Sequence, residues 1–360
     1  MSPVAAVGLA TALAAGTTVA ANTASAEPTA STASTMPTVT PICTEHYPIG
    51  EESDRYLLCE VTSTGVVELP SGGSGALYVH AAGQPGATSK GGGGGRAQTL
   101  IDLDASDDLY VYLTSGGRGE DPYAGGSSTV VTTAPIEVST IDDVIVIAGG
   151  GGARGRKIEW TEYVFNRPVY KWCGEGNGGA GGFVDAEQEN AGASGPGTSP
   201  ATASGGYSTN GSTCPDDEPI GHQPMPGNAG IGGRQTAGGD RDGYDGIGGP
   251  GGSRDGGIQP WTDADGNPVA AESCNCPVPK GYIAGAGGAW NGHNSAGGGG
   301  GNGGGGGGDK TWGGAGGGSY AAAPTGEFDL RDPNPRYVLD LPGWKDPNTD
   351  HASVWFYYEA

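Results

Sequence analysis

The stretch "DDVIVIAGGGGARGR", residues 142 to 156, joins a run of β-forming residues to a glycine loop. Gly150, Gly152 and Gly155 in this loop have the G-x-G-x-x-G spacing of a dinucleotide-binding loop. Such a loop needs a helix directly after the glycines and an acidic residue about 20 positions further on. The residues that follow are instead "KIEWTEYVFNRPVYKW", which are rich in β-branched and aromatic types. We therefore predict a strand after the loop and no nucleotide site.

Composition explains why the spacing occurs without its usual function. The chain has 360 residues, of which 75 are glycine, so matches to a three-glycine pattern arise by chance. A second match, "GEGNGG", begins at Gly174. Glycine spacing alone therefore carries no functional information in this chain.

The charge balance bears on the class of partner. The formal net charge is −23, with 40 acidic side chains against 17 basic ones. Over long range such a chain repels nucleic acids and anionic membrane surfaces, and no basic stripe in the sequence offsets this. We expect no nucleic-acid partner.

The N-terminal region predicts export. Residues 1–26 form an alanine-rich apolar run that ends in "ASA", which is typical of a secretory signal peptide with its cleavage site, although the usual Lys or Arg at the start is missing. No later stretch is long and apolar enough to cross a bilayer. We expect a secreted or cell-surface protein with no membrane span.

Cysteine usage fits an oxidising compartment. The chain has six cysteines: Cys43, Cys59, Cys173, Cys214, Cys274 and Cys276. Six cysteines allow 15 pairings, and the sequence does not choose among them. A bridge between Cys43 and Cys59 closes a short loop and is the single pair we favour. The "CNC" spacing at the last two cysteines is too tight for the common zinc pattern, so we expect structural disulfides and no metal or other cofactor.

Patterning divides the rest of the chain into five parts. Residues 27–41 read as a Pro/Ser/Thr linker, 42–64 as an N-terminal disulfide-linked segment, and 65–173 and 326–360 as the first and closing parts of a β-sandwich, with a glycine-rich region at 174–325 between them. Alternation is clearest in two predicted strands. In the first, one face carries Leu109, Val111 and Leu113 and the other carries Tyr110 and Tyr112. In the second, one face carries Val354, Phe356 and Tyr358 and the other carries Trp355 and Tyr357.

The glycine-rich region lies between strands that need one another, so a structureless insertion of that length is improbable. Glycine buries no side-chain area, and it loses more chain entropy on folding than any other residue. One structure that offsets this cost is a bundle of extended threefold helices, in which rods without Cβ atoms approach closely and exchange main-chain hydrogen bonds. We expect the glycine-rich region to form such rods.

The order of these motifs resembles a known module. The stretch that runs from "GVVELPSGGSGALYVH" through "GGSSTVV" and "VIVIAGGGGARG" to "GGGGGNGGGGGGDKTWGGAGGGSY" is similar to the glycine-rich extracellular module of the anaplastic lymphoma kinase and leukocyte tyrosine kinase receptors and of secreted bacterial and phage proteins. The resemblance covers roughly residues 65–360. It implies an all-β fold, namely a jelly-roll-like β-sandwich of the tumour-necrosis-factor type with an inserted bundle of polyglycine II helices.

Two of the quoted stretches have a specific role in this resemblance. "VIVIAGGGGARG" corresponds to a strand that runs into the first rods, and "GGAGGGSY" corresponds to the last rod before the sheet resumes. The chain has no kinase domain and no transmembrane span, so the receptors' signalling role does not transfer, and no ligand-contact residue matches by motif.

The sequence contains no recognisable catalytic motif. The five histidines lie far apart, the serines form no G-x-S-x-G elbow, and adjacent acidic pairs are typical of solvated turns. Two Asp-rich clusters resemble oxygen-rich calcium sites without matching a known calcium loop, and Asx-turns are the alternative. These residues are Asp240, Asp242, Asp245, Asp263 and Asp265.

Three aromatic residues among the glycines are the candidate ligand contacts: Trp290, Trp312 and Tyr320. Exposed, they would form stacking surfaces for an extracellular protein or carbohydrate; packed, they would close the rods or cover the sandwich. We expect a secreted, non-catalytic module for recognition or adhesion at a cell surface. The alternatives are a self-associating protein of an extracellular coat and, third, a hydrolase with an unrecognised site.

Overall fold

The computed structural model describes residues 36–46, 56–70, 75–104, 107–113, 123–136, 139, 141–185, 201–210, 298, 299, 301, 305, 307, 308, 311–325 and 352–359. Within these ranges the protein is all-β, with a single 3₁₀ turn at Ile141–Asp143 as its helical content. The predicted all-β class is confirmed for this part of the chain. The expected signal peptide lies outside it.

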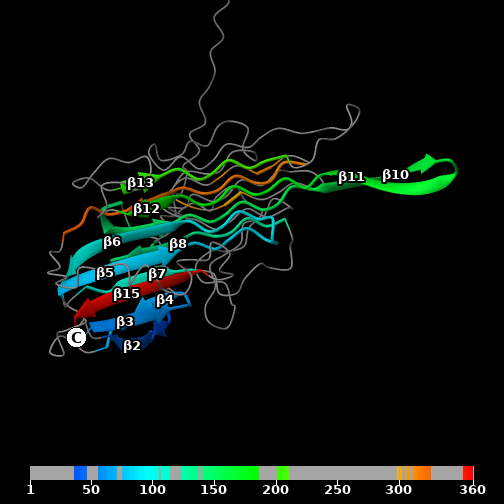
Figure 1. Ribbon diagram of the computed structural model, residues 1–360. Coiled ribbons are helices and arrows are strands. Elements are labelled where there is room, and N and C mark those ends of the chain that lie inside the picture. The colour runs from blue at the N-terminus through cyan, green and yellow to red at the C-terminus, as the bar shows by residue number, and fades with distance from the viewer. Residues whose placement is uncertain are drawn as a thin grey trace, which may run out of the picture. The chain divides into compact units, whose positions relative to one another are not determined.

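Two sheets form a sandwich-like arrangement (Figure 1). The first contains, in spatial order, β1 (Thr38–Val39), β4 (Gly65–Val67), β7 (Leu109–Tyr112), β8 (Thr129–Thr132), β9 (Val144–Ala148), β14 (Ser319–Ala321) and β13 (Ala201–Ala203). The second contains β12 (Phe183–Asp185), β6 (Arg96–Leu103), β5 (Gly75–Ala82), β15 (Ser353–Glu359), β3 (Tyr56–Val61) and β2 (Ile42–His46). A separate hairpin consists of β10 (Lys157–Val164) and β11 (Arg167–Gly174).

The main core contains the apolar side chains of both sheets. Val79 on β5 and Phe356 on β15 are fully buried in the same cluster as Val111, Val131 and Val146 of the first sheet. A second cluster, around Tyr112, Val130 and Ile147, also draws on strands of the first sheet. The predicted alternation on β7 is confirmed, because Leu109, Val111 and Leu113 belong to the main core, whereas Tyr112 and Tyr110 belong to the second cluster.

The last strand completes the sheet that the first strands begin. β15 pairs antiparallel with both β3 and β5, so the end of the chain lies between strands from its first quarter. Val354, Phe356 and Tyr358 are buried, whereas Trp355 and Tyr357 are partly exposed, which confirms the predicted alternation. The strands on either side of the glycine-rich region therefore share one core.

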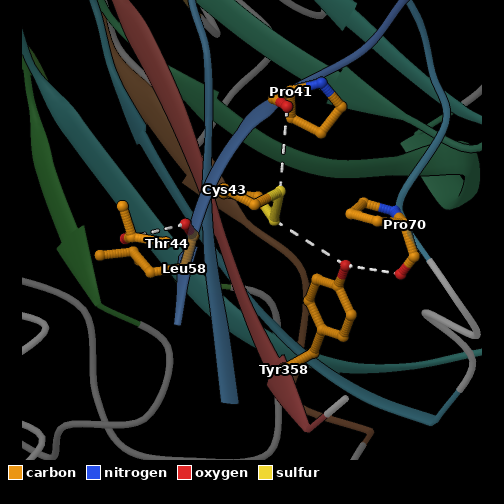
Figure 2. Close-up of a disulfide and its surroundings, with 7 residues drawn as sticks. Pro41, Cys43, Thr44, Leu58, Pro70 and Tyr358 are labelled. Carbon is orange, nitrogen blue, oxygen red and sulfur yellow. Dashed lines mark hydrogen bonds between the residues drawn. A yellow bond between two sulfur atoms is a disulfide. The ribbon is translucent and has the colours of Figure 1, made fainter. Parts of the chain in front are cut away.

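A disulfide joins the two strands at one edge of the second sheet. Cys43 on β2 and Cys59 on β3 are directly opposite in register and are bonded, as predicted (Figure 2). The Tyr358 hydroxyl lies 3.8 Å from Cys59 Sγ and donates a hydrogen bond of 3.0 Å to the Pro70 carbonyl. Burial raises the pKa of Tyr358 to about 12. The bridge therefore packs directly against the closing strand.

Glycine-rich segments extend from the ends of the strands, and Figure 1 shows several of them running side by side. They exchange main-chain hydrogen bonds although they are neither helices nor strands of a sheet. Gly92 N donates to Gly152 O, Gly152 N donates to Gly179 O, and Gly179 N donates to Gly314 O, each at 2.8 Å. A chain of main-chain bonds thus links four segments that are far apart in sequence.

The central segment, residues 149–155, has more neighbours than a strand in a sheet can have. It bonds residues 83–95 through Gln84 and Gly92, and it also bonds Gly126, Gly179 and the segment that contains Gly314 and Gly317. A strand has one hydrogen-bonded neighbour on each side, whereas this segment bonds four other segments. Its main-chain bonds therefore point in several directions around its axis.

The described glycine segments differ in extent from the region delimited by composition. Residues 83–95 and 124–128, which lie within the span assigned to the sandwich, take part in the same main-chain bonding as residues 174–182 and 311–318. Likewise, β1 lies within the segment that composition assigns to the linker, and it pairs parallel with β4. Among the described residues, short glycine-rich connections between strands therefore share this main-chain bonding with parts of the long tract.

Candidate binding surface

The glycine loop that opens the sequence analysis has no room for a phosphate. A Cβ placed on Gly150 would lie 1.9 Å from the Gly126 carbonyl oxygen, and one on Gly152 would lie 1.9 Å from that of Gly314. The space beside each glycine is therefore filled by the main chain of another segment. The chain then continues into β10 rather than a helix, as predicted.

The three candidate aromatics lie in different environments. Tyr320 on β14 is buried, with only 7% of its surface exposed, and it packs in the second cluster. Burial, followed by the charge of Asp142, raises the pKa of its hydroxyl. Trp312 is half-buried at the other end of the same glycine segment, and Trp290 lies outside the described residues. The structure therefore does not bring Trp312 and Tyr320 together on one surface.

The largest group of exposed aromatic residues in the described part of the chain lies instead on the β10–β11 hairpin, which extends beyond the glycine segments (Figure 1). Phe165 is 97% exposed, Tyr170 82%, Tyr163 75% and Trp172 46%. Exposed aromatic side chains in such number are rare on a protein surface without a function, and aromatic residues dominate the energy of binding surfaces. This hairpin is the candidate binding surface.

Strand register sorts these side chains between two faces. Tyr163 is opposite Pro168, and Tyr170 is opposite Thr161, so these residues share one face. The other face carries Val164 and Val169, which are 44% and 38% exposed. The tip of the hairpin therefore has apolar side chains on both faces, with the charged Arg167 opposite Val164 on the second face.

The turn at the tip places an aromatic residue in an unfavourable backbone conformation. Val164 pairs with Arg167, which leaves Phe165 and Asn166 as the two turn residues. Both have positive φ angles, 49° and 58°. A two-residue turn of this kind strongly favours Asn and Gly, and a positive φ is costly for a bulky residue such as phenylalanine. The geometry of the turn therefore does not explain why residue 165 is a phenylalanine.

Charged contacts anchor the base of the hairpin. Glu175, directly after β11, accepts hydrogen bonds from Lys90 Nζ at 2.7 Å and Arg154 Nη1 at 3.0 Å. The bond from Lys90 lowers the pKa of the Glu175 carboxyl. Lys90 and Lys157 also lie over the Trp172 ring, at 5.7 Å and 5.4 Å from its centroid.

A buried residue lies beside the same anchor. Cys173, next to Trp172, is disulfide-bonded and fully buried. Its burial and the ion pairs of Glu175 hold the end of β11 against the described fold. The hairpin is therefore held at its base, with its tip exposed.

Charge on the hairpin differs in sign from that of the whole chain. Residues 157–174 contain three basic and two acidic side chains, a balance of +1 within a chain of net charge −23. Lys171 forms an ion pair with Glu162, and Lys157 with Glu159. Arg167, near the tip, takes part in neither of these ion pairs.

The sequence contains the residues of this surface but does not predict its exposure. "KIEWTEYVFNRPVYKW" predicts strand structure, and aromatic residues in strands are usually covered by a neighbouring sheet. The signal that identifies the hairpin is the lack of clear polar alternation around a two-residue turn, combined with glycine-rich sequence on both sides. Among the described strands, none pairs with β10 or β11 apart from each other.

Comparison with known proteins found no relative. A scan against models of protein families gave no match, and a search of curated proteins also gave none. Among the described residues, no group of three or more His, Cys, Asp or Glu side chains is arranged to hold a metal ion. The same part of the chain contains no helix of the length and hydropathy needed to cross a membrane.

Proposed function

We propose that this chain is a secreted, non-catalytic module that recognises or adheres to a cell surface, and that the β10–β11 hairpin makes the contact. The observation that carries the proposal is the set of exposed aromatic residues, Tyr163, Phe165 and Tyr170, at the end of an anchored hairpin. A binding element that is held rigid before contact loses less conformational entropy on binding. The ion pairs of Glu175 and the burial of Cys173 support that rigidity.

The proposal includes the finer architecture. The sandwich is a jelly-roll of the tumour-necrosis-factor type, and the glycine segments form a bundle of polyglycine II helices, as in the extracellular module of the anaplastic lymphoma kinase and leukocyte tyrosine kinase receptors. Bonding of residues 149–155 to four other segments supports this, because rods in a bundle bond in several directions. Such a bundle is a stiff mount for the hairpin.

Export is part of the same proposal. Cys43 is bonded to Cys59, and Cys173 is also in a disulfide. Disulfides persist mainly in oxidising compartments outside the cytosol. They support a protein that acts at the outside of a cell.

Cell binding tests the proposal. The full chain, labelled with a fluorophore, is added to cells of the species that produces it, and bound fluorescence is measured against concentration. A variant with Tyr163→Ser, Phe165→Asn and Tyr170→Ser should bind at least about tenfold more weakly, because truncation of aromatic anchors commonly costs more than about 1 kcal/mol each.

The control separates the hairpin from exposed aromatics in general. Tyr207, in the segment 201–210, is 61% exposed and lies outside the hairpin, so Tyr207→Ser should bind like the wild type. Thermal unfolding of all variants should be unchanged within a few degrees, because the altered side chains are exposed. Equal binding by the hairpin variant and the wild type would rule out the hairpin as the contact.

A further inference from the structure

We propose that the tip of the hairpin, residues 163–170, inserts into the headgroup region of a lipid bilayer that contains anionic lipids. This rests on the proposed adhesion function and names the surface to which the chain adheres. The argument has four parts: the distribution of apolar side chains around the tip, the depth that the tip can reach, the position of charge along the hairpin, and the residue at the turn.

The apolar side chains surround the tip. Tyr163, Pro168 and Tyr170 lie on one face, Val164 and Val169 lie on the other beside Arg167, and Phe165 is at the turn. A protein partner that docks on a two-stranded ribbon covers one face and leaves the other in water. A bilayer interface contacts both faces and the turn together, so this distribution fits a lipid surface better than a protein one.

The length of the apolar tip matches the depth of the interface. From Phe165 back to Tyr163 the strand rises about 7 Å. Interfacial protein segments bury their apolar groups about 5–10 Å into the headgroup and acyl boundary. Glu162, which forms an ion pair with Lys171, is opposite Val169, so the boundary with water lies at this level, and Tyr170, opposite Thr161, lies at that boundary.

The strand edges limit insertion to this depth. β10 and β11 form a two-stranded sheet, so each strand has one row of main-chain groups that bonds no other strand of that sheet. Such groups are costly in the hydrocarbon core, where water is absent. At headgroup depth they keep their bonds to water. The Tyr163 and Tyr170 rings fit this level, since tyrosine is enriched at membrane–water interfaces.

Charge along the hairpin favours anionic lipids. Arg167 is within the tip and takes part in neither hairpin ion pair, whereas Lys171 and Lys157, nearer the base, are paired with glutamates. Juxtamembrane basic residues are attracted by the negative surface potential of anionic lipids.

The negative charge of the whole chain does not prevent this contact. Each hairpin strand has eight residues, which extend about 27 Å. At physiological ionic strength, charges are largely screened beyond about 8 Å. The net charge of −23 therefore repels a membrane only weakly at the tip of the hairpin.

The turn residue gives independent support. Phe165 has a φ of 49°, which asparagine or glycine adopts at lower cost. The Phe165 side chain is also 97% exposed. A bulky apolar side chain in such a strained conformation is expected where it binds a partner outside the protein. Lipid insertion uses that side chain directly, since the turn is the first part of the hairpin to enter the interface.

Vesicle binding tests the proposal. The full chain is mixed with vesicles of phosphatidylcholine alone, or of phosphatidylcholine and phosphatidylglycerol in equal amounts, and the bound fraction is measured by co-sedimentation. We expect binding to the mixed vesicles. Phe165→Asn should weaken it at least about tenfold, because a buried phenylalanine side chain is lost, whereas the thermal midpoint should stay the same or rise as the turn loses strain.

A second variant tests the charge. Arg167→Gln should weaken binding to the mixed vesicles about fivefold and should not change the affinity for phosphatidylcholine vesicles. Tyr207→Ser, as the matched aromatic control, should bind like the wild type. The intrinsic fluorescence of the wild-type chain should decrease when the chain binds vesicles whose lipids carry a quencher at the headgroup.

The outcomes separate this proposal from the proposed function. Hairpin-dependent binding to cells without any binding to vesicles overturns the lipid proposal and leaves adhesion standing, with a protein or a carbohydrate as the partner. Vesicle binding that Phe165→Asn does not weaken also overturns the lipid proposal. Absence of both cell binding and vesicle binding overturns the two together.

Discussion

Gly152 illustrates, at the scale of single residues, why the central glycine segment excludes side chains. A Cβ at this position would lie 1.9 Å from the carbonyl oxygen of Gly314 and 2.3 Å from its carbonyl carbon. Both atoms belong to the main chain, so no rotamer change relieves the overlap. The adjacent Ala153 is fully buried and does carry a Cβ, so the requirement for glycine depends on position within the segment.

Substitution at Gly152 measures this constraint. Gly152→Ala should lower the free energy of unfolding by about 3 kcal/mol or more, because overpacking against main-chain atoms forces two segments apart. The measurement is denaturant-induced unfolding. At Gly206 the nearest atom to an added Cβ is Ala180 N at 3.1 Å, so Gly206→Ala should cost less than about 1 kcal/mol. Equal costs for the two substitutions would contradict the close main-chain packing at Gly152.

The glycine segments act as ordered structural elements because main-chain hydrogen bonds join them to one another. Gly92, Gly152 and Gly179 each donate an amide hydrogen bond to another segment. Unfolded glycine has the largest conformational freedom of any residue, so these bonds, and the close contacts between segments, have to offset that entropy.

Amide hydrogen exchange tests the order of these elements. The amides of Gly92, Gly152 and Gly179 should exchange as slowly as those of β5 and β9, since exchange requires the segments to separate. Phe165 and Asn166, at the exposed turn of the hairpin, supply a fast-exchanging reference within the same sample. Exchange of the three glycine amides at the rate of the hairpin turn would show that the segments are not an ordered part of the fold.

The observed strands show which local sequence patterns are sufficient to predict a strand. β9 and β10 follow from β-branched and aromatic runs on either side of the glycine loop, and β15 follows from strict alternation. The pairing of β15 between β3 and β5 does not follow from any local pattern, because it joins residues more than 270 positions apart. Local patterns identify strands, whereas partners depend on which strands can close the same core.

His80 links the stability of the whole molecule to pH. It lies on β5 between β6 and β15, it is 2% exposed, and burial, followed by the charge of Arg96, lowers its pKa from 6.5 to about 3. Between these two values the unfolded chain binds a proton at this residue and the folded chain does not. Its contribution to stability is therefore complete above about pH 6.5 and is lost as the pH falls towards about 3.

Unfolding at several pH values measures this linkage. As the pH falls from about 6 to about 4, His80 should lower the free energy of unfolding by up to about 1.4 kcal/mol per pH unit. Other titrating groups also contribute, so the relevant quantity is the difference from His80→Gln, which cannot bind the proton. Identical pH dependence in the two proteins would show that His80 titrates normally in the folded state.

The whole molecule also decides where binding residues lie. Trp312 and Tyr320 are prominent in the sequence because they stand among glycines, yet Tyr320 is buried in the second cluster and Trp312 is half-buried. Tyr163, Phe165 and Tyr170 read as ordinary strand residues, yet they are the most exposed aromatics of the hairpin. Exposure depends on what packs against a strand, and that is a property of the assembled fold.

The amino-acid sequence by itself determined the all-β class, the alternation of β7 and β15 and the strand in place of a nucleotide-binding helix, because each depends on residue types that are close together in the chain. It favoured the Cys43–Cys59 bridge without excluding other pairings. Only the tertiary structure decided that β15 closes the sheet begun by β3 and β5, that short glycine connections join the bonded segments, and that the β10–β11 hairpin is uncovered. The physical reason is that glycine carries no side chain to indicate its partners. Which main chains approach one another is therefore settled only when the strands on both sides of the glycine segments have packed into one core.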